Sequence, residues 1–171
     1  EANRTPVPER YELLKSHHAT CEKRYYPLSQ EVVLGTWCGD YDYVLGLLDR
    51  CYFPTREGVA NFHDNFVDAC VLAGKAKLEK GDAKAAIALY EKAFTYPENH
   101  QVFLVDERAT HDAQINYELG VAYESLGDKE NADKYYELAA GQDFKLKGSR
   151  DFRYWTGLAL GKLGRKAEAK A

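Results

Sequence analysis

The sequence predicts an all-α fold built from paired helices. Apolar and small residues recur at helical spacing over residues 113–126, the run breaks at Gly127, and a second helical run comes after it. Gly120 and Ala132 remove side-chain volume where two such helices must touch, and Tyr136 fills the space beside them, so we expect an antiparallel helical hairpin. The same spacing of small residue and turn glycine recurs elsewhere in the chain, which predicts a stack of hairpins.

Size and charge limit the classes of protein to which the chain can belong. A length of 171 residues with 45% hydrophobic residues suffices for one compact domain or a short solenoid. The net charge is −4 and the basic residues are not clustered, so we expect neither a nucleic-acid-binding nor an anionic-membrane-binding surface. No apolar run approaches the roughly 20 residues that cross a bilayer, and residues 1–10 lack a signal-peptide core. We therefore expect a cytoplasmic protein.

The two ends of the sequence suggest a piece of a larger protein. The chain begins without methionine, and Ala171 falls inside a run with helical character. We expect a longer parent chain. An exposed last hairpin would favour self-association through an uncapped apolar face, with a homodimer as one alternative.

Cysteines and histidines give little indication of a chemical site. The four cysteines have no CxxC spacing, so we expect reduced core residues and no metal; they are Cys21, Cys38, Cys51 and Cys70. His17 and His18 are adjacent on a predicted helix and point about 100° apart, which disfavours one shared metal and favours a surface position. His63, His100 and His111 lie in or beside connections, where solvated or capping roles are the default and a composite site is the alternative. Without HExxH, GxSxG or a phosphate loop, we expect no enzyme and no cofactor.

The first third of the chain contains a linker, a helix and a divergent pair. Residues 1–8 are expected to be a linker or frayed end, and a helix is predicted from Pro8 to about residue 26. A helix pair is predicted over residues 26–52, with Ser29 as the N-cap of its first helix and a turn at Gly39. Its apolar residues are expected on one side of each helix; in the first they are Val32, Val33 and Trp37.

Three further copies are predicted at residues 64–96, 112–140 and 151–171, which gives one helical-repeat domain over residues 9–171. In each copy a helix glycine precedes the turn glycine by seven residues; these pairs are Gly74 and Gly81, Gly120 and Gly127, and Gly157 and Gly164. The first two copies also place a tyrosine nine residues after the turn glycine. The connections at residues 96–112 and 141–151 are longer than those of a regular array, and such loops are often functional.

The central copy resembles a tetratricopeptide repeat. Its signature runs L-G-x-x-Y followed by A-x-x-x-F, and the matching residues are Leu119, Gly120, Tyr123, Gly127, Ala132, Tyr136 and Ala139. The resemblance implies a right-handed superhelix, an α-solenoid of about four helix pairs, that acts as a non-catalytic interaction or scaffolding module. Residues 60–165 also look similar to helical-repeat regions of large bacterial proteins linked to carbohydrate metabolism. That likeness implies the alternative of an accessory domain of a carbohydrate-active enzyme.

The resemblance also implies where a partner binds. In such repeats the concave wall carries the residues three before and one after each helix glycine, which here are Val71, Lys75, Tyr117, Val121, Tyr154 and Leu158. Tyrosine suits recognition because it offers a large apolar ring, a hydroxyl and few torsions; packing against the next helix is the alternative for both tyrosines. Asp106 and Glu107 in the first long connection would contact a basic partner or remain solvated. The expected partner is a protein or peptide segment, or another domain of the same parent chain.

Overall fold

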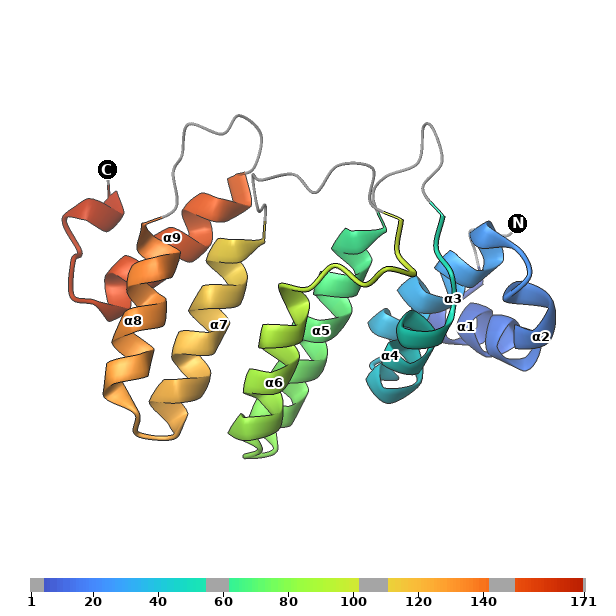
Figure 1. Ribbon diagram of the computed structural model, residues 1–171, viewed down its shortest axis with the longest axis horizontal. Coiled ribbons are helices and arrows are strands. Elements are labelled where there is room, and N and C mark those ends of the chain that lie inside the picture. Colours follow the sequence, from blue (N-terminus) through green and yellow to red (C-terminus); the bar gives the residue numbers. More distant parts are fainter. Residues whose placement is uncertain (1–4, 55–61, 102–110, 142–149, 171) are drawn as a thin grey trace. The chain divides into compact units, whose positions relative to one another are not determined.

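The structure is a computed structural model, and it describes residues 5–54, 62–101, 111–141 and 150–170. These residues form nine α-helices and one 3-10 helix (Figure 1). The elements are α1 (Val7–Ser16), α2 (His18–Cys21), α3 (Tyr25–Trp37), α4 (Tyr41–Arg50), α5 (His63–Glu79), α6 (Ala83–Ala93), α7 (Asp112–Ser125), α8 (Lys129–Ala140), α9 (Arg150–Lys162) and η2 (Glu168–Lys170). The all-α prediction is confirmed, since the described residues contain no strand beyond one isolated bridge.

Contacts divide the chain into two compact units. The N-terminal unit contains Glu1–Ala73 and Thr95–Val105, and the C-terminal unit contains Gly74–Phe94 and Asp106–Ala171. The boundary between the units falls inside α5.

Glycines with positive φ make the turns after α3, α5, α7 and α9. Gly39, Gly81, Gly127 and Gly164 have φ angles of 77°, 80°, 74° and 74°. Residues with a Cβ rarely adopt this conformation, so glycine ends each helix at little cost. In two of the turns an aspartate comes next and caps the second helix: the side chains of Asp82 and Asp128 accept hydrogen bonds from backbone N–H groups three residues on. The turns predicted at these glycines are confirmed.

The N-terminal helix is shorter and starts earlier than the sequence pattern suggests. It begins at Val7 with Pro8 in its first turn, where proline lacks no needed donor. It ends at Ser16, and His17 separates it from the one-turn helix α2. Val7 and Pro8, which were expected to belong to a linker or frayed end, therefore belong to the helix.

Two expectations for α3 are wrong. The helix begins at Tyr25, so Arg24 occupies the N-cap position and Ser29 lies inside the helix, where its Oγ donates to the carbonyl of Tyr26 at 2.9 Å. Trp37 is 68% exposed and does not join the packed side of the helix. That side is formed by buried residues; in α3 and α4 they include Leu28, Val32, Leu34, Val44, Leu47 and Leu48.

Aromatic rings fill the rest of the core of the N-terminal unit. Phe53 and Phe62 stack with ring centroids 4.2 Å apart, and His100 meets both rings edge-on. The Nε2 of His100 lies 2.8 Å from the carbonyl oxygen of Leu48 and is placed to donate to it. His63 is also buried and stacks on Tyr96 at 4.1 Å. The expectation that His63 and His100 are solvated loop residues is thus wrong, because both imidazole rings are buried and pack against aromatic rings.

The C-terminal unit contains two hairpins closed by a tyrosine on a glycine. A Cβ at Gly120 would lie 2.5 Å from Cε1 of Tyr136, and one at Gly74 would lie 2.3 Å from Cε1 of Tyr90. Only hydrogen fits under these rings, so the predicted close contacts are confirmed for both hairpins.

The expectation of a close helix contact at Gly157 is wrong. A Cβ there would meet no described atom within 4 Å. In the other two hairpins the covering tyrosine comes nine residues after the turn glycine. After the Gly164 turn the described residues form η2 rather than a second long helix. Nevertheless α9 packs on α8, where Ala159 joins a cluster with Ala132, Tyr136 and Ala139.

Candidate functional site

The predicted wall residues separate into three groups. Val71 is 1% exposed and offers almost no surface to a partner. Asp106 and Glu107 lie outside the described residues. The others belong to α5, α7 and α9 of the C-terminal unit and are at least partly exposed; they are Lys75, Tyr117, Val121, Tyr154 and Leu158.

An aromatic cluster joins α7 and α9. The ring centroids of Tyr117 and Trp155 lie 5.5 Å apart, and those of Tyr154 and Trp155 lie 5.0 Å apart in an edge-to-face arrangement. Tyr154 is 62% exposed, so most of its ring faces solvent. Trp155 was not among the predicted contacts, although its place beside Tyr154 and one helical turn before Ala159 could have indicated it.

Tyr117 both supports the hairpin and reaches the surface. Its ring centroid lies 5.7 Å from that of Tyr136, and the ring contacts Trp155 on another side. Burial is the largest cause that raises the pKa of the Tyr117 hydroxyl, so the ring stays neutral at physiological pH. The alternative for the two tyrosines was packing against neighbouring helices. It therefore applies to much of the Tyr117 ring and to little of the Tyr154 ring.

The cations beside this cluster are paired within the C-terminal unit. Lys75 Nζ lies 2.7 Å from Oε1 of the buried Glu118 and 5.3 Å from the ring centroid of Trp155. Lys162 contacts the carboxylate of Glu124, and the Tyr136 hydroxyl donates to the same carboxylate at 2.9 Å. The charges of Lys75 and Lys162 are therefore compensated locally.

The N-terminal unit carries exposed rings that the sequence pattern did not indicate as a surface. Tyr26 is 71% exposed and Trp37 is 68% exposed, and both belong to α3. Cys38, the residue after Trp37, is also exposed, so the expectation of a core position is wrong for this cysteine. The other three cysteines are buried, as expected.

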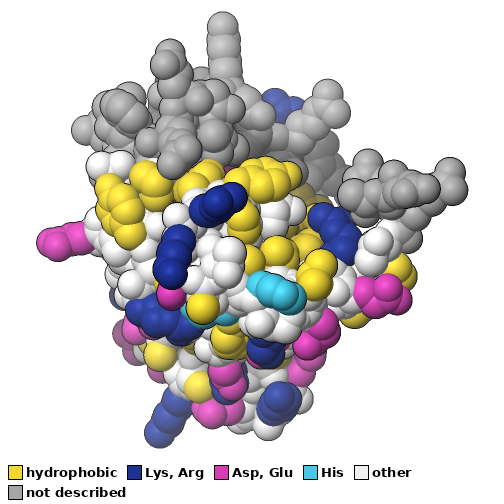
Figure 2. Space-filling view, turned by 90° about the vertical axis from the view of Figure 1, so that its right-hand side faces the viewer, with side chains coloured by type: hydrophobic (Ala, Val, Ile, Leu, Met, Phe, Trp, Pro, Cys, Tyr) yellow, Lys and Arg dark blue, Asp and Glu magenta, His cyan; other side chains and the backbone are white. Residues whose placement is uncertain are grey.

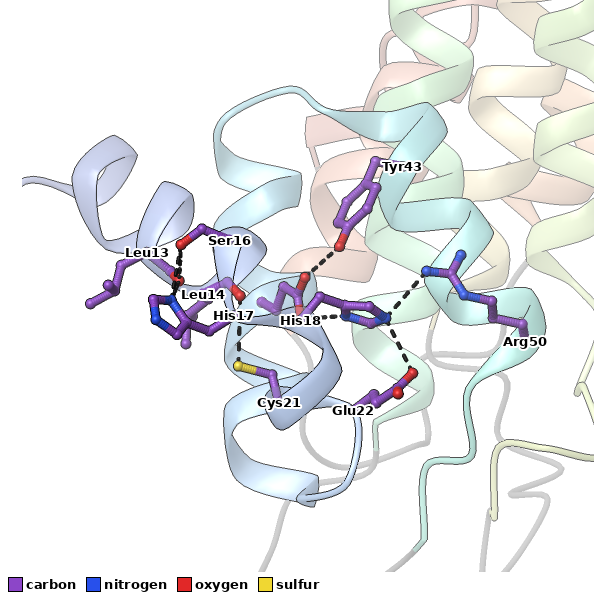
Figure 3. Close-up of polar contacts among 10 residues, drawn as sticks. Leu13, Leu14, Ser16, His17, His18, Cys21, Glu22, Tyr43 and Arg50 are labelled. Atoms are coloured by element: carbon purple, nitrogen blue, oxygen red, sulfur yellow. Dashed lines mark hydrogen bonds and ion pairs between the residues drawn. The ribbon is translucent and has the colours of Figure 1, made fainter.

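A buried glutamate organises the polar contacts around α2. Glu31 is fully buried; its Oε2 lies 3.1 Å from Nδ1 of His18 and its Oε1 accepts from the Tyr43 hydroxyl at 2.5 Å. Figure 3 shows the His18 ring between Glu22 and Arg50. His17 is exposed, as predicted, whereas His18 anchors α2 to α3 and α4. Two hydrogen bonds satisfy Glu31, which is what a buried carboxylate requires.

The described part of the chain has neither a metal cluster nor a membrane-spanning helix. No group of three or more His, Cys, Asp or Glu side chains among these residues is arranged to hold a metal ion. Of the helices that the structure describes, none combines the length and apolar character needed to cross a bilayer.

Comparison with known proteins identifies the repeats. The family model of the tetratricopeptide repeat matches residues 67–100 and 113–145. No curated protein matches the chain significantly. The fold is similar to the structure described as "Crystal structure of MamA", with 17% identity, a TM-score of 0.47, and coverage of 93% of this chain and 80% of that chain. None of these matches supports the carbohydrate-linked alternative. Two tetratricopeptide repeats are thus identified in the chain, at residues 67–100 and 113–145.

Proposed function

We propose that the chain binds an apolar segment of a partner protein on the exposed side of α7 and α9. Tetratricopeptide repeats generally mediate protein–protein interactions and are generally non-catalytic. The proposed binding surface, which we name the aromatic surface, comprises Lys75, Tyr117, Val121, Tyr154, Trp155 and Leu158. The observation that carries the proposal is the ring of Tyr154, which is 62% exposed while it is held edge-on by Trp155.

The chemistry of the aromatic surface favours an apolar partner segment. Tyr154 and Trp155 offer rigid rings that lose little conformational entropy on binding. Lys75 is already paired with Glu118, so a partner carboxylate would have to replace an existing ion pair and gain little. An apolar or aromatic side chain could instead cover Tyr154 and Leu158 without breaking any such pair.

Selection of peptides provides a direct test. We would select binders for the chain from a phage-displayed peptide library and measure the affinity of the best labelled peptide by fluorescence anisotropy. We expect apolar or aromatic residues in the selected peptides. The substitution Tyr154→Ala should weaken binding about tenfold or more, since loss of a central aromatic contact typically costs at least about 1.4 kcal/mol. The double variant Tyr117→Ala with Tyr154→Ala should abolish binding.

A matched control distinguishes the aromatic surface from exposed aromatic rings in general. Tyr26→Ala removes a ring that is exposed to a similar degree in the N-terminal unit, and it should leave the affinity unchanged. Helical content of each variant would be checked by circular dichroism, because Tyr117 also packs on Tyr136. Equal peptide affinity for wild type and Tyr154→Ala, or an equal loss in Tyr26→Ala, would overturn the proposal.

A further inference from the structure

The N-terminal unit contains a pocket of about 490 Å³ at the end of α4. It lies away from the residues of the aromatic surface in sequence and belongs to a different unit. Its walls come from the end of α2, the start of α3, and the end of α4 with the residues after it; the lining residues are Glu22, Lys23, Tyr25, Leu28, Arg50, Cys51, Tyr52 and Pro54. This volume falls in the range of small-molecule sites, roughly 300–1,000 Å³.

Two cations in the wall lack a carboxylate partner among the described residues. Arg50 is the last residue of α4, and its Nη2 makes one long contact, 3.4 Å, with Nε2 of His18. Lys23 is exposed and forms no ion pair with a described residue. Figure 3 shows the Arg50 side chain extending from α4 toward His18 and the region of Glu22. These cations can turn toward an anionic group without breaking an ion pair.

The one carboxylate among the lining residues belongs to Glu22. Glu22 Oε2 lies 3.4 Å from Nε2 of His18, whose Nδ1 faces the buried Glu31. The lining therefore carries two cations, Lys23 and Arg50, and one carboxylate, Glu22, and the imidazole of His18 lies beside that carboxylate. The balance favours an anion over a cation in the pocket.

The remaining walls are flat and apolar. Tyr52 is 55% exposed, and Tyr25, Leu28 and Pro54 complete the apolar lining. Burial raises the pKa of the Cys51 thiol, so this group stays protonated and acts as part of the apolar wall. Figure 2 shows one face of the molecule on which hydrophobic side chains gather next to lysines and arginines. A ligand with a planar apolar body suits such walls.

We propose that this pocket binds a small aromatic acid, a molecule with one carboxylate or phosphate group on an aromatic ring. Arg50 and Lys23 hold the anionic group, and Arg50 can do so with two parallel N–H donors. The ring packs against Tyr52 and Pro54. The site shares no residue with the aromatic surface, so the chain would bind a small molecule as well as a partner protein.

Binding of simple aromatic acids tests the proposal. We would titrate the full chain with benzoate and with phenyl phosphate, and follow binding by saturation-transfer difference NMR, with benzyl alcohol as the neutral probe. We expect at least one of the two acids to bind at millimolar concentration and benzyl alcohol to bind far more weakly. Preference for benzoate would assign a carboxylate ligand, and preference for phenyl phosphate would assign a phosphate ligand.

Substitutions locate the binding and exclude loss of fold. Arg50→Gln and Tyr52→Ala should each weaken binding of the better probe about tenfold, while Arg153→Gln, which removes an exposed arginine of α9, should not change it. Lys23→Gln is a second variant that removes a cation without affecting the His18 contact. Absence of binding by both acids, equal binding of benzyl alcohol, or undiminished binding in folded Arg50→Gln and Lys23→Gln would overturn the proposal.

Discussion

The two complete hairpins of the C-terminal unit use the same ring contact but differ at the tyrosine hydroxyl. Tyr136 covers Gly120 and donates to Glu124, which stands four residues after that glycine. Tyr90 covers Gly74 in the same way, but the residue four positions after Gly74 is Leu78, and the buried hydroxyl of Tyr90 has no hydrogen-bond partner among the described residues. The difference shows that packing of the tyrosine ring on the glycine closes both hairpins. The hydrogen bond of the hydroxyl is an additional contact that only one of them makes among the described residues.

Helix α9 extends the comparison, since its glycine is open. Gly157 has the spacing of Gly74 and Gly120 from its turn glycine, yet no described side chain covers it. The spacing of helix glycine and turn glycine therefore predicts where a ring can pack. Whether a ring packs there depends on the second helix of the hairpin. This contrast gives matched substitutions whose effects should differ in size and in sign.

The largest expected effect comes from a bulky side chain under the ring. Gly120→Leu should lower the free energy of unfolding by about 3 kcal/mol, at the upper end of the overpacking range, because the new side chain collides with Tyr136. Gly157→Leu should change it by less than about 1 kcal/mol, because the space is open. Urea denaturation followed by circular dichroism measures both. Equal losses in the two variants would show that the ring contact does not distinguish these glycines.

Removal of the two tyrosine hydroxyls tests the difference between the hairpins. Tyr136→Phe should destabilise the protein by about 1 kcal/mol, since it removes a hydrogen bond to a carboxylate. Tyr90→Phe should be neutral or stabilising by a similar amount, because it removes a buried hydroxyl that has no described partner. Midpoints of thermal unfolding give the comparison. A larger loss in Tyr90→Phe than in Tyr136→Phe would contradict this account of the hydroxyls.

Alanine at Gly157 and alanine at Gly120 should change the free energy of unfolding in opposite directions. Gly157→Ala should stabilise by roughly 0.5–1 kcal/mol, because alanine favours the helix and its methyl group meets open space. Gly120→Ala should destabilise despite the same gain in helix propensity, since the methyl group would contact Tyr136 at 2.5 Å. Chemical denaturation with both variants in parallel measures the signs, and stabilisation by both would remove the steric argument.

Local spacing in the sequence predicted the features that depend on neighbouring residues. The turns at Gly81 and Gly127, and the cover of Gly120, result from turn chemistry and helical periodicity. The open Gly157 could not be predicted in this way, because its cover depends on a ring from the segment after the Gly164 turn.

Predictions of exposure were wrong where burial depends on long-range packing. His63 and His100 stand in polar stretches of sequence, and only the fold brings the rings of Phe66 and Tyr96 against them. Val71 has the register of a surface position but is buried. Trp155 shows the converse, since a residue beside a predicted contact completes the cluster that Tyr154 exposes.

Glu124 should give the smallest effect, and one that depends on pH. A hydrogen bond from Lys162 is the main cause that lowers the pKa of Glu124 below its usual value of 4.5, and the bond from Tyr136 adds to it. A carboxyl group with a lower pKa in the folded state contributes stability above its unfolded pKa and loses it as pH falls through the folded pKa. We therefore expect the acid side of the stability profile, below about pH 4.5, to be flatter in Glu124→Gln than in wild type.

The size of that effect depends on exposure. The Glu124 side chain is 50% exposed, so solvent screens its ion pair and the pH-dependent contribution should be a few tenths of a kcal/mol. Urea denaturation at about pH 6 and about pH 3 measures the difference between the two proteins. Leu78→Gln is the matched control, because this position in the other hairpin carries no charge to titrate and its profile should keep the wild-type slope. Parallel profiles for wild type and Glu124→Gln would show that the contact between α7, α8 and α9 at this carboxylate contributes nothing to the free energy of unfolding. The packing of the tyrosine ring on the helix glycine would then be the whole difference between a closed and an open hairpin.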